Sequence, residues 1–203
     1  MSISNRLAGG ITLTCLIFGS QTPLAADRSD NETLSVLVRV DNLAGVRPEH
    51  LRFAEDRAAA VFGRIGATIR WIDEDETVRE GIRAPLTVVL VNAETHRAVA
   101  SLFVDALGLA YPSVRRAQVF YDRVVALNVG TDRTIPSLLG DVIAHELGHL
   151  LLPPPGHSLD GIMRAELETR SWAFRTFTPP QAREVLSRLR RLPSVALTSV
   201  PVR

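Results

Sequence analysis

The sequence contains no lysine, and its single cysteine lies close to the start of the chain. The absence of lysine excludes a catalytic lysine. Cys15 lies in a leader that we expect to be removed, so the mature chain has no disulfide and no cysteine nucleophile. The sequence also lacks an excess of either charge, because it contains 22 arginines besides Arg6 and 22 acidic residues. This balance carries no electrostatic signature of nucleic-acid binding, so we expect no nucleic-acid partner.

The first 26 residues have the pattern of a secretory signal peptide. Arg6 supplies the positive start, Leu7–Phe18 is apolar, and Leu24–Ala26 offers small residues for cleavage. The apolar stretch is too short to span a membrane comfortably, although an uncleaved anchor is the alternative. We therefore expect a secreted or periplasmic protein with no stable membrane span in its mature form. Residues 27–203 are long enough for one well-buried domain.

The segment His145–His149 has the form H-E-x-x-H, which is the strongest chemical signal in the chain. In a helix, His145 and His149 lie one turn apart on one face and can bind a single metal ion. Zinc suits two imidazole ligands, and it lowers the pKa of a bound water to about 7. Glu146 lies next to this face, where it can act as general base toward that water and then protonate the leaving amine.

The flanking sequence predicts that this motif lies on a helix over Ile135–Leu152. Thr134 can cap the start of the helix, and Pro136 suits its first turn. Gly148 costs roughly 1 kcal/mol relative to alanine inside a helix, and close approach of another backbone would explain it. The alternative is a core helix with two satisfied histidines. An apolar stripe opposite the histidines consists of Leu139, Ile143, Leu147 and Leu150.

A zinc site also needs a third protein ligand. Pro153–Pro155 ends the helix, Gly156 permits a tight turn, and His157 follows eight residues after His149. We take His157 as the candidate ligand, with a surface loop histidine as the alternative. The other candidates for this role are Asp160, Glu166 and Glu168.

Together these residues resemble the metzincin clan of zinc peptidases, whose pattern is H-E-x-x-H-x-x-G-x-x-H followed by a methionine-containing turn. The matching residues, by type and order, are His145, Glu146, His149, His157 and Met163. The segment His157–Met163 is similar to the His-Ser…Met segment of matrixin-type members. Leu152 stands where the family has its glycine and Pro155 where it has its third histidine, so the loop to His157 is two residues longer.

The resemblance implies an α+β, zincin-like domain with a mixed twisted sheet of about five strands, a backing helix, an active-site helix and a C-terminal helix. It implies a zinc-dependent endopeptidase that acts on protein or peptide substrates, with zinc bound by His145, His149 and His157. Met163 would lie beneath the metal, and ordinary core filling is its alternative role. Two other functions stay open: a non-proteolytic zinc-binding envelope or interaction module, and a zinc amidohydrolase acting on a non-peptide amide.

Hydrophobic periodicity outlines the remaining elements. Helices are expected at Pro48–Gly63 and Thr178–Leu192, and strands at Thr33–Val40, Thr68–Ile72, Pro85–Val91, Ala117–Tyr121 and Val124–Val129. Leu107–Pro112 is expected to be a loop. The acidic run Asp73–Glu76 is expected to be a solvated loop, with a calcium site as the alternative. In metzincins an edge strand pairs with extended substrate, and Ala117–Tyr121 is the candidate for that strand or an ordinary interior strand. Asp141, one turn before His145, would either orient that histidine or lie on a solvated surface.

Overall fold

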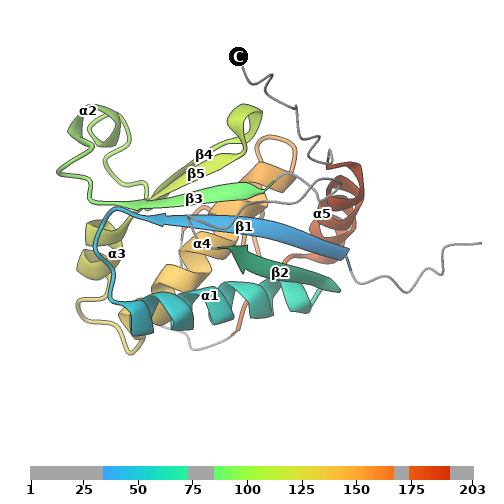
Figure 1. Cartoon of the computed structure of the whole chain (residues 1–203), viewed down its shortest axis with the longest axis horizontal. Helices are drawn as coiled ribbons and strands as arrows, with labels where there is room; N and C mark the ends of the chain where they lie inside the picture. Colours follow the sequence, from blue (N-terminus) through green and yellow to red (C-terminus); the bar gives the residue numbers. More distant parts are fainter. Residues whose placement is uncertain (1–33, 73–84, 167–173, 193–203) are drawn as a thin grey trace, which may run out of the picture. The chain divides into compact units, whose positions relative to one another are not determined.

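The computed structural model describes residues 34–72, 85–166 and 174–192, which belong to one compact unit, Thr33–Arg203 (Figure 1). The described strands are β1 (Leu34–Asn42), β2 (Ala67–Ile72), β3 (Leu86–Val91), β4 (Gly108–Tyr111) and β5 (Arg116–Phe120). The described helices are α1 (Pro48–Gly63), α2 (Arg97–Ala100), η1 (Pro112–Val114), α3 (Tyr121–Leu127), α4 (Ile135–Leu151) and α5 (Pro179–Arg191). The expected signal peptide, Asp73–Glu76 and Glu168 lie outside the described residues.

The five strands form one mixed sheet in the order β2-β1-β3-β5-β4. β1 is parallel to β2 and to β3, β3 is parallel to β5, and β4 is antiparallel to β5. α1 makes the crossover from β1 to the adjacent parallel strand β2, as parallel neighbours require. This is the predicted α+β architecture with a five-stranded mixed sheet, a backing helix, a motif-bearing helix and a C-terminal helix.

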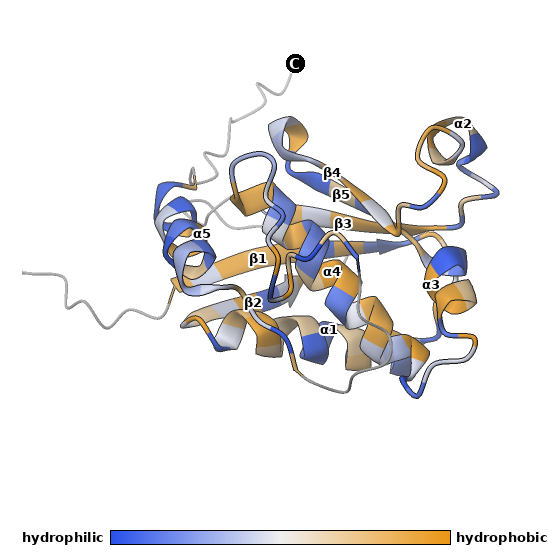
Figure 2. Ribbon diagram, turned by 180° about the vertical axis from the view of Figure 1, so that it is seen from behind, coloured by the Kyte–Doolittle hydropathy of each residue, from blue (hydrophilic) through white to orange (hydrophobic). Residues whose placement is uncertain are grey.

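Alternate residues of the strands face a common core with α1 and α4. Val36 and Val38 of β1 and Leu90 of β3 are buried in this core together with Phe62 of α1 and Leu147 of α4. α4 lies behind the sheet in Figure 1 and in front of it in the reversed view of Figure 2. α1 packs against α4 and shares its core with the sheet, so α1 and α4 cover the same face. The opposite face of β3 and β5 has a smaller cluster of Val89, Val91, Ala100 and Phe120.

Three sequence predictions about local structure were wrong or incomplete. The stretch 107–112 contains strand β4 rather than only a loop, and β4 rather than β5 is the terminal strand of the sheet at this side. The predicted strand Val124–Val129 lies largely in helix α3. The start of α3 is fixed by the carboxylate of Asp122 in its first turn. This carboxylate accepts hydrogen bonds from the backbone N–H of Ala93 at 2.9 Å and from the backbone N–H of Arg123 at 3.0 Å. A carboxylate in the first turn favours a helix over the β-branched preference of the valines.

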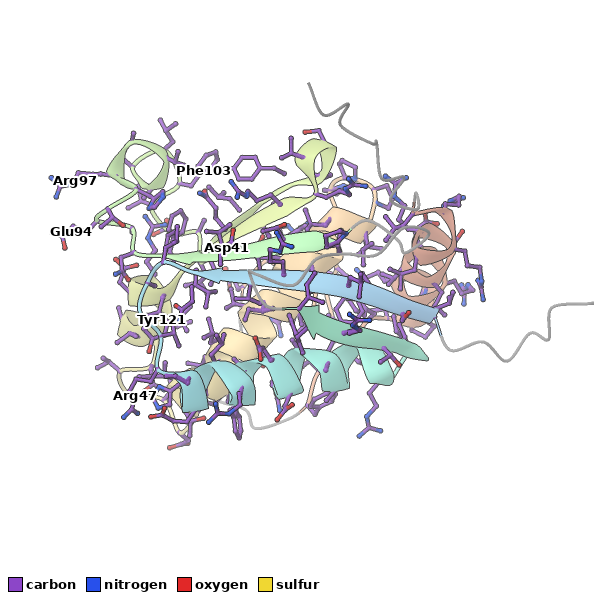
Figure 3. All side chains as sticks on the ribbon, viewed as in Figure 1. Asp41, Arg47, Glu94, Arg97, Phe103 and Tyr121 are labelled. Carbon is purple, nitrogen blue, oxygen red and sulfur yellow. The ribbon has the colours of Figure 1, made fainter. Side chains whose placement is uncertain are left out.

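The connection from β3 to β4 contains the short helix α2. Arg97 and Glu94 form an exposed ion pair of 3.6 Å at its tip, and Figure 3 shows both side chains pointing outward. The guanidinium group of Arg123 donates to the carbonyl oxygens of Ala100, Phe103 and Ala106. One side chain thus holds the chain that leads into β4 against α3.

Helix α4 begins as the sequence predicted. The Thr134 side chain accepts the backbone N–H of Ser137 at 3.3 Å, and Pro136 occupies the first turn. Gly140 allows α4 to pack closely on α1, because a Cβ there would lie 2.7 Å from the backbone oxygen of Ala54. Among the described residues, no helix has the length and apolar character needed to cross a membrane.

Asp141 on α4 has neither of its expected roles. It is fully buried, and its carboxylate accepts from Arg57 of α1 at 2.7 Å and from Arg133 at 2.6 Å. Arg133 also donates to the buried hydroxyl of Ser137 at 2.6 Å. The network joins α1, the approach to α4 and α4 itself, so it fixes the start of the helix that bears the two histidines.

We expect Asp141→Ala to lower the free energy of unfolding by about 3–5 kcal/mol, because it removes the buried carboxylate that the guanidinium groups of Arg57 and Arg133 both contact. Urea unfolding followed by circular dichroism measures this loss. The control is Glu184→Ala, which breaks an exposed ion pair with Arg191 and should cost less than about 1 kcal/mol. Equal, small losses in both variants would contradict the structural role of Asp141.

Candidate metal centre

Two elements bring three histidines together. His145 and His149 lie one turn apart near the end of α4, which ends at Leu151. The proline run 153–155 then carries the chain away from the helix axis. Gly156 has a φ of +72°, and a Cβ there would lie 2.8 Å from Nδ1 of His149. Glycine therefore permits both the turn and the close approach that return His157 to the helix.

The three imidazoles direct ring nitrogens at one point. Nε2 of His149 lies 3.0 Å from Nε2 of His145 and 3.1 Å from Nε2 of His157. All three potential ligand atoms lie within 4.8 Å of one another. Two nitrogens of a tetrahedral zinc site, each at about 2.1 Å from the metal, are separated by about 3.4 Å. The spacing of the histidine nitrogens therefore fits a single ion of this size.

The tautomer of His145 is fixed by the loop after His157. Nδ1 of His145 lies 2.8 Å from the carbonyl oxygen of Ile162, to which it donates, so the lone pair of Nε2 faces the other two rings. The loop itself is pinned, because Ser158 N–H donates to the Met163 carbonyl at 2.9 Å and Ile162 N–H to the Thr176 carbonyl at 2.9 Å. A hydrogen bond to the second ring nitrogen is the usual way in which proteins orient a metal-binding imidazole.

Met163 lies directly beneath α4 and is fully buried. A Cβ on Gly148 would collide with its Sδ and would lie 3.0 Å from the ring of Phe177. The glycine of the motif is therefore explained by close side chains rather than by the approaching backbone that the sequence suggested. Met163 thus fills the core against the histidine-bearing helix, which is the alternative role that the sequence offered for it.

Among the residues that the structure describes, the three histidines are the one group of three or more potential ligands close enough to share a metal ion. Asp160 and Glu166, the other described candidates for the third ligand, do not belong to it. The histidine group is thus able to hold a metal ion. Neutral imidazole is the form that binds metal, and burial lowers the pKa of His145 and that of His149, the latter to about 4.

Glu146 lies beside the histidines with only 5% of its surface exposed. Burial raises the pKa of its carboxyl to about 8. A dication held by the neighbouring imidazoles would lower that pKa again and favour the carboxylate. Gly108, the first residue of β4, packs on this side chain: a Cβ there would lie 2.7 Å from Cδ of Glu146 and 2.7 Å from the backbone oxygen of Gln118. The sequence gives no sign of this contact, because the pattern over Leu107–Pro112 predicts a loop rather than a strand.

The histidines and Glu146 open into a cleft of about 710 Å³. One wall is the chain from Asp105 through β4 to Pro112, and the other is formed by α4 and the proline run. Arg164, Ala165 and Glu166 also line it. The cleft therefore places a buried carboxylate, three imidazole nitrogens and a strand backbone around one space.

The molecule is thus a small α+β domain with a mixed sheet and a three-histidine cluster able to hold a metal ion. No protein-family model matches the chain, and no curated protein sequence matches it. Among solved structures, it is similar to a zinc-dependent peptidase from Methanocorpusculum labreanum (strain Z), with a TM-score of 0.43 and 15% sequence identity. The match covers 76% of this chain and 99% of that one.

We expect His157→Ala to weaken zinc binding more than roughly 100-fold, because it removes one of three converging ligands. Titration with zinc in the presence of a competing chelator measures the affinity. The matched control is His96→Ala, since His96 lies on the connection before α2 and outside the histidine group. Unchanged affinity in the His157 variant would exclude this residue as a ligand.

We expect Gly148→Ala to destabilise the fold by about 1–3 kcal/mol, because the added methyl group overpacks Met163 and Phe177. Since Met163 follows the Ile162 carbonyl that orients His145, zinc affinity should also fall, by about tenfold. Urea unfolding and the zinc titration measure the two effects. Gly63→Ala is the control: no atom lies within 4 Å of its added Cβ, so both quantities should stay at or above their wild-type values.

Proposed function

We propose that this protein is a zinc-dependent endopeptidase of the metzincin type, exported through the leader at residues 1–26. The observation that carries the proposal is the convergence of His145, His149 and His157 in a cleft beside the buried carboxylate of Glu146. Imidazoles alone suit zinc better than magnesium or calcium, which prefer oxygen ligands. Zinc held there would supply Lewis-acid polarisation of the scissile carbonyl and would lower the pKa of the attacking water.

Glu146 would act as the proton carrier of the reaction. As a carboxylate it takes a proton from the water that attacks the peptide carbonyl. It then delivers this proton to the nitrogen of the leaving amine, so the carboxylate is regenerated and the atoms balance. Its position supports this role, because the buried side chain lines the cleft beside the three imidazoles.

Strand β4 would hold the substrate. It is the last strand in the sheet order, and the cleft beside it is lined by Gly108, Leu109 and Ala110. An extended polypeptide can pair with the main chain of such an edge strand, which positions the scissile bond without demanding one particular sequence. We therefore assign the substrate-binding role to β4 instead of the stretch 117–121, which was the candidate from the sequence.

The two alternative functions fit the site less well. A structural zinc site has four protein ligands, whereas the group among the described residues has three, which leaves one coordination position for chemistry. An amidohydrolase for a small non-peptide amide would suit an enclosed pocket. The cleft here is bounded by an edge strand along one side, which suits a polypeptide.

We expect Glu146→Gln to retain one zinc ion per chain while the rate of cleavage of an unfolded protein substrate falls about 10²–10⁴-fold. The amide keeps the size of the side chain but cannot accept the proton. Gel-based cleavage assays and zinc analysis on the same preparations give both quantities. Equal cleavage by wild type and variant would remove Glu146 from the mechanism, and cleavage by neither with zinc bound would favour a non-proteolytic role.

A further inference from the structure

A second cavity, of about 420 Å³, lies at the end of β4 away from Glu146. Its described lining consists of Pro112, Ser113, Arg115, Leu150, Arg188, Arg191 and Leu192. Three of these residues are arginines and none is acidic. We refer to this cavity as the arginine pocket. Its described lining has no carboxylate, whereas the lining of the cleft includes Asp105, Glu146 and Glu166 besides Arg164.

The arginines come from two elements that are distant in sequence. Arg115 follows η1, whereas Arg188 and Arg191 are neighbours on one face of α5. Arg191 pairs with Glu184 at 3.3 Å. Within the part of the chain that the structure describes, the guanidinium groups of Arg115 and Arg188 make no hydrogen bond or ion pair. Two guanidinium groups that have no carboxylate partner among the described residues therefore line one concave space.

The backbone at Arg115 is held in an unusual conformation. Its φ of +52° is the one positive value at a non-glycine residue in the described ranges. Its N–H donates to the Pro112 carbonyl at 3.2 Å, and its own carbonyl accepts from Thr87 of β3 at 2.9 Å. Such conformations are costly for residues with a side chain, and they gather at binding sites where the surroundings impose them. Here the conformation places a cation at the end of β4.

The arginine pocket continues the cleft. Pro112 lines both cavities, and β4 runs from Gly108, which packs on Glu146, to Tyr111, just before Pro112. Four strand residues cover about 10 Å, from one end to the other. A polypeptide that pairs with β4 in the more stable antiparallel direction would have its N-terminal part at the Pro112 end. Residues preceding the scissile bond by a few positions would therefore reach the arginines.

We propose that the arginine pocket is a substrate subsite that binds carboxylate side chains located N-terminal to the scissile bond. Planar guanidinium groups bind carboxylates through two parallel hydrogen bonds, and Ser113 can donate a further one. The link to cleavage rests on the proposed peptidase function, whereas the preference for acidic peptides does not. The pocket would give the enzyme a charge preference that the apolar part of the cleft cannot provide.

The test uses the zinc-loaded full chain carrying Glu146→Gln, so that binding is measured without cleavage. Two fluorescein-labelled peptides of the same length carry three glutamates or three glutamines before a shared apolar centre, and a third carries the glutamates after it. Fluorescence anisotropy should show the first peptide binding about five- to tenfold more tightly than the other two. Adding salt should reduce this ratio, because the contacts are partly exposed.

Arg115→Gln/Arg188→Gln should bring the ratio to about one. The control, Arg183→Gln/Arg190→Gln, removes the same charge from exposed positions of α5 that do not line the pocket and should keep the ratio. Equal binding of all peptides, or loss of the ratio in both double variants, would overturn the proposal. Tight binding of inorganic phosphate without peptide discrimination would also overturn it in favour of a small-anion site. If the preference holds but the wild-type protein cleaves none of the three peptides, the peptidase function fails and the pocket stands.

Discussion

Three imidazole nitrogens that point at one place repel one another through their lone pairs, and a cation between them turns this repulsion into binding. The local chain is arranged to impose this convergence. The Ile162 carbonyl fixes which nitrogen of His145 carries the proton, and the turn at Gly156 brings His157 back to α4. Gln181 of α5 donates to the Gly156 carbonyl at 3.1 Å, so the C-terminal helix also holds this turn in place.

Helix α4 can carry such a site because its other contacts are fixed independently. Its first half is bound to α1 through Gly140 and through the buried carboxylate of Asp141. Its second half lies on Met163, which fills the space left by Gly148. A site whose ligands lie on a rigid helix keeps its geometry better than one built from loops alone. The part of the site that lies outside the helix is thus reduced to the short return from Leu151 to His157.

The sequence predicted the features that depend on local patterns and missed those that depend on distant partners. The bounds of α1 and α4 follow from apolar periodicity and proline in the first turn, and the start of α4 also from a capping threonine, all of which can be read from neighbouring residues. The four residues of β4 form a strand only because they pair with β5, and no period is visible in so short a stretch. Likewise, the partners of Asp141 include Arg57, 84 positions away, which periodicity cannot reveal.

The position of β4 connects the sheet with the chemistry of the site. A side chain at position 108 would meet both the Glu146 carboxyl group and the backbone of β5, so only glycine lets the edge strand pass directly over the carboxylate. The main chain that would pair with a substrate and the group that would move its proton are therefore in direct contact. Because β4 continues from there toward Arg115, the same short strand would align the scissile bond with Glu146 and the preceding residues with a basic pocket. Reactivity and charge preference would then follow from a single strand register.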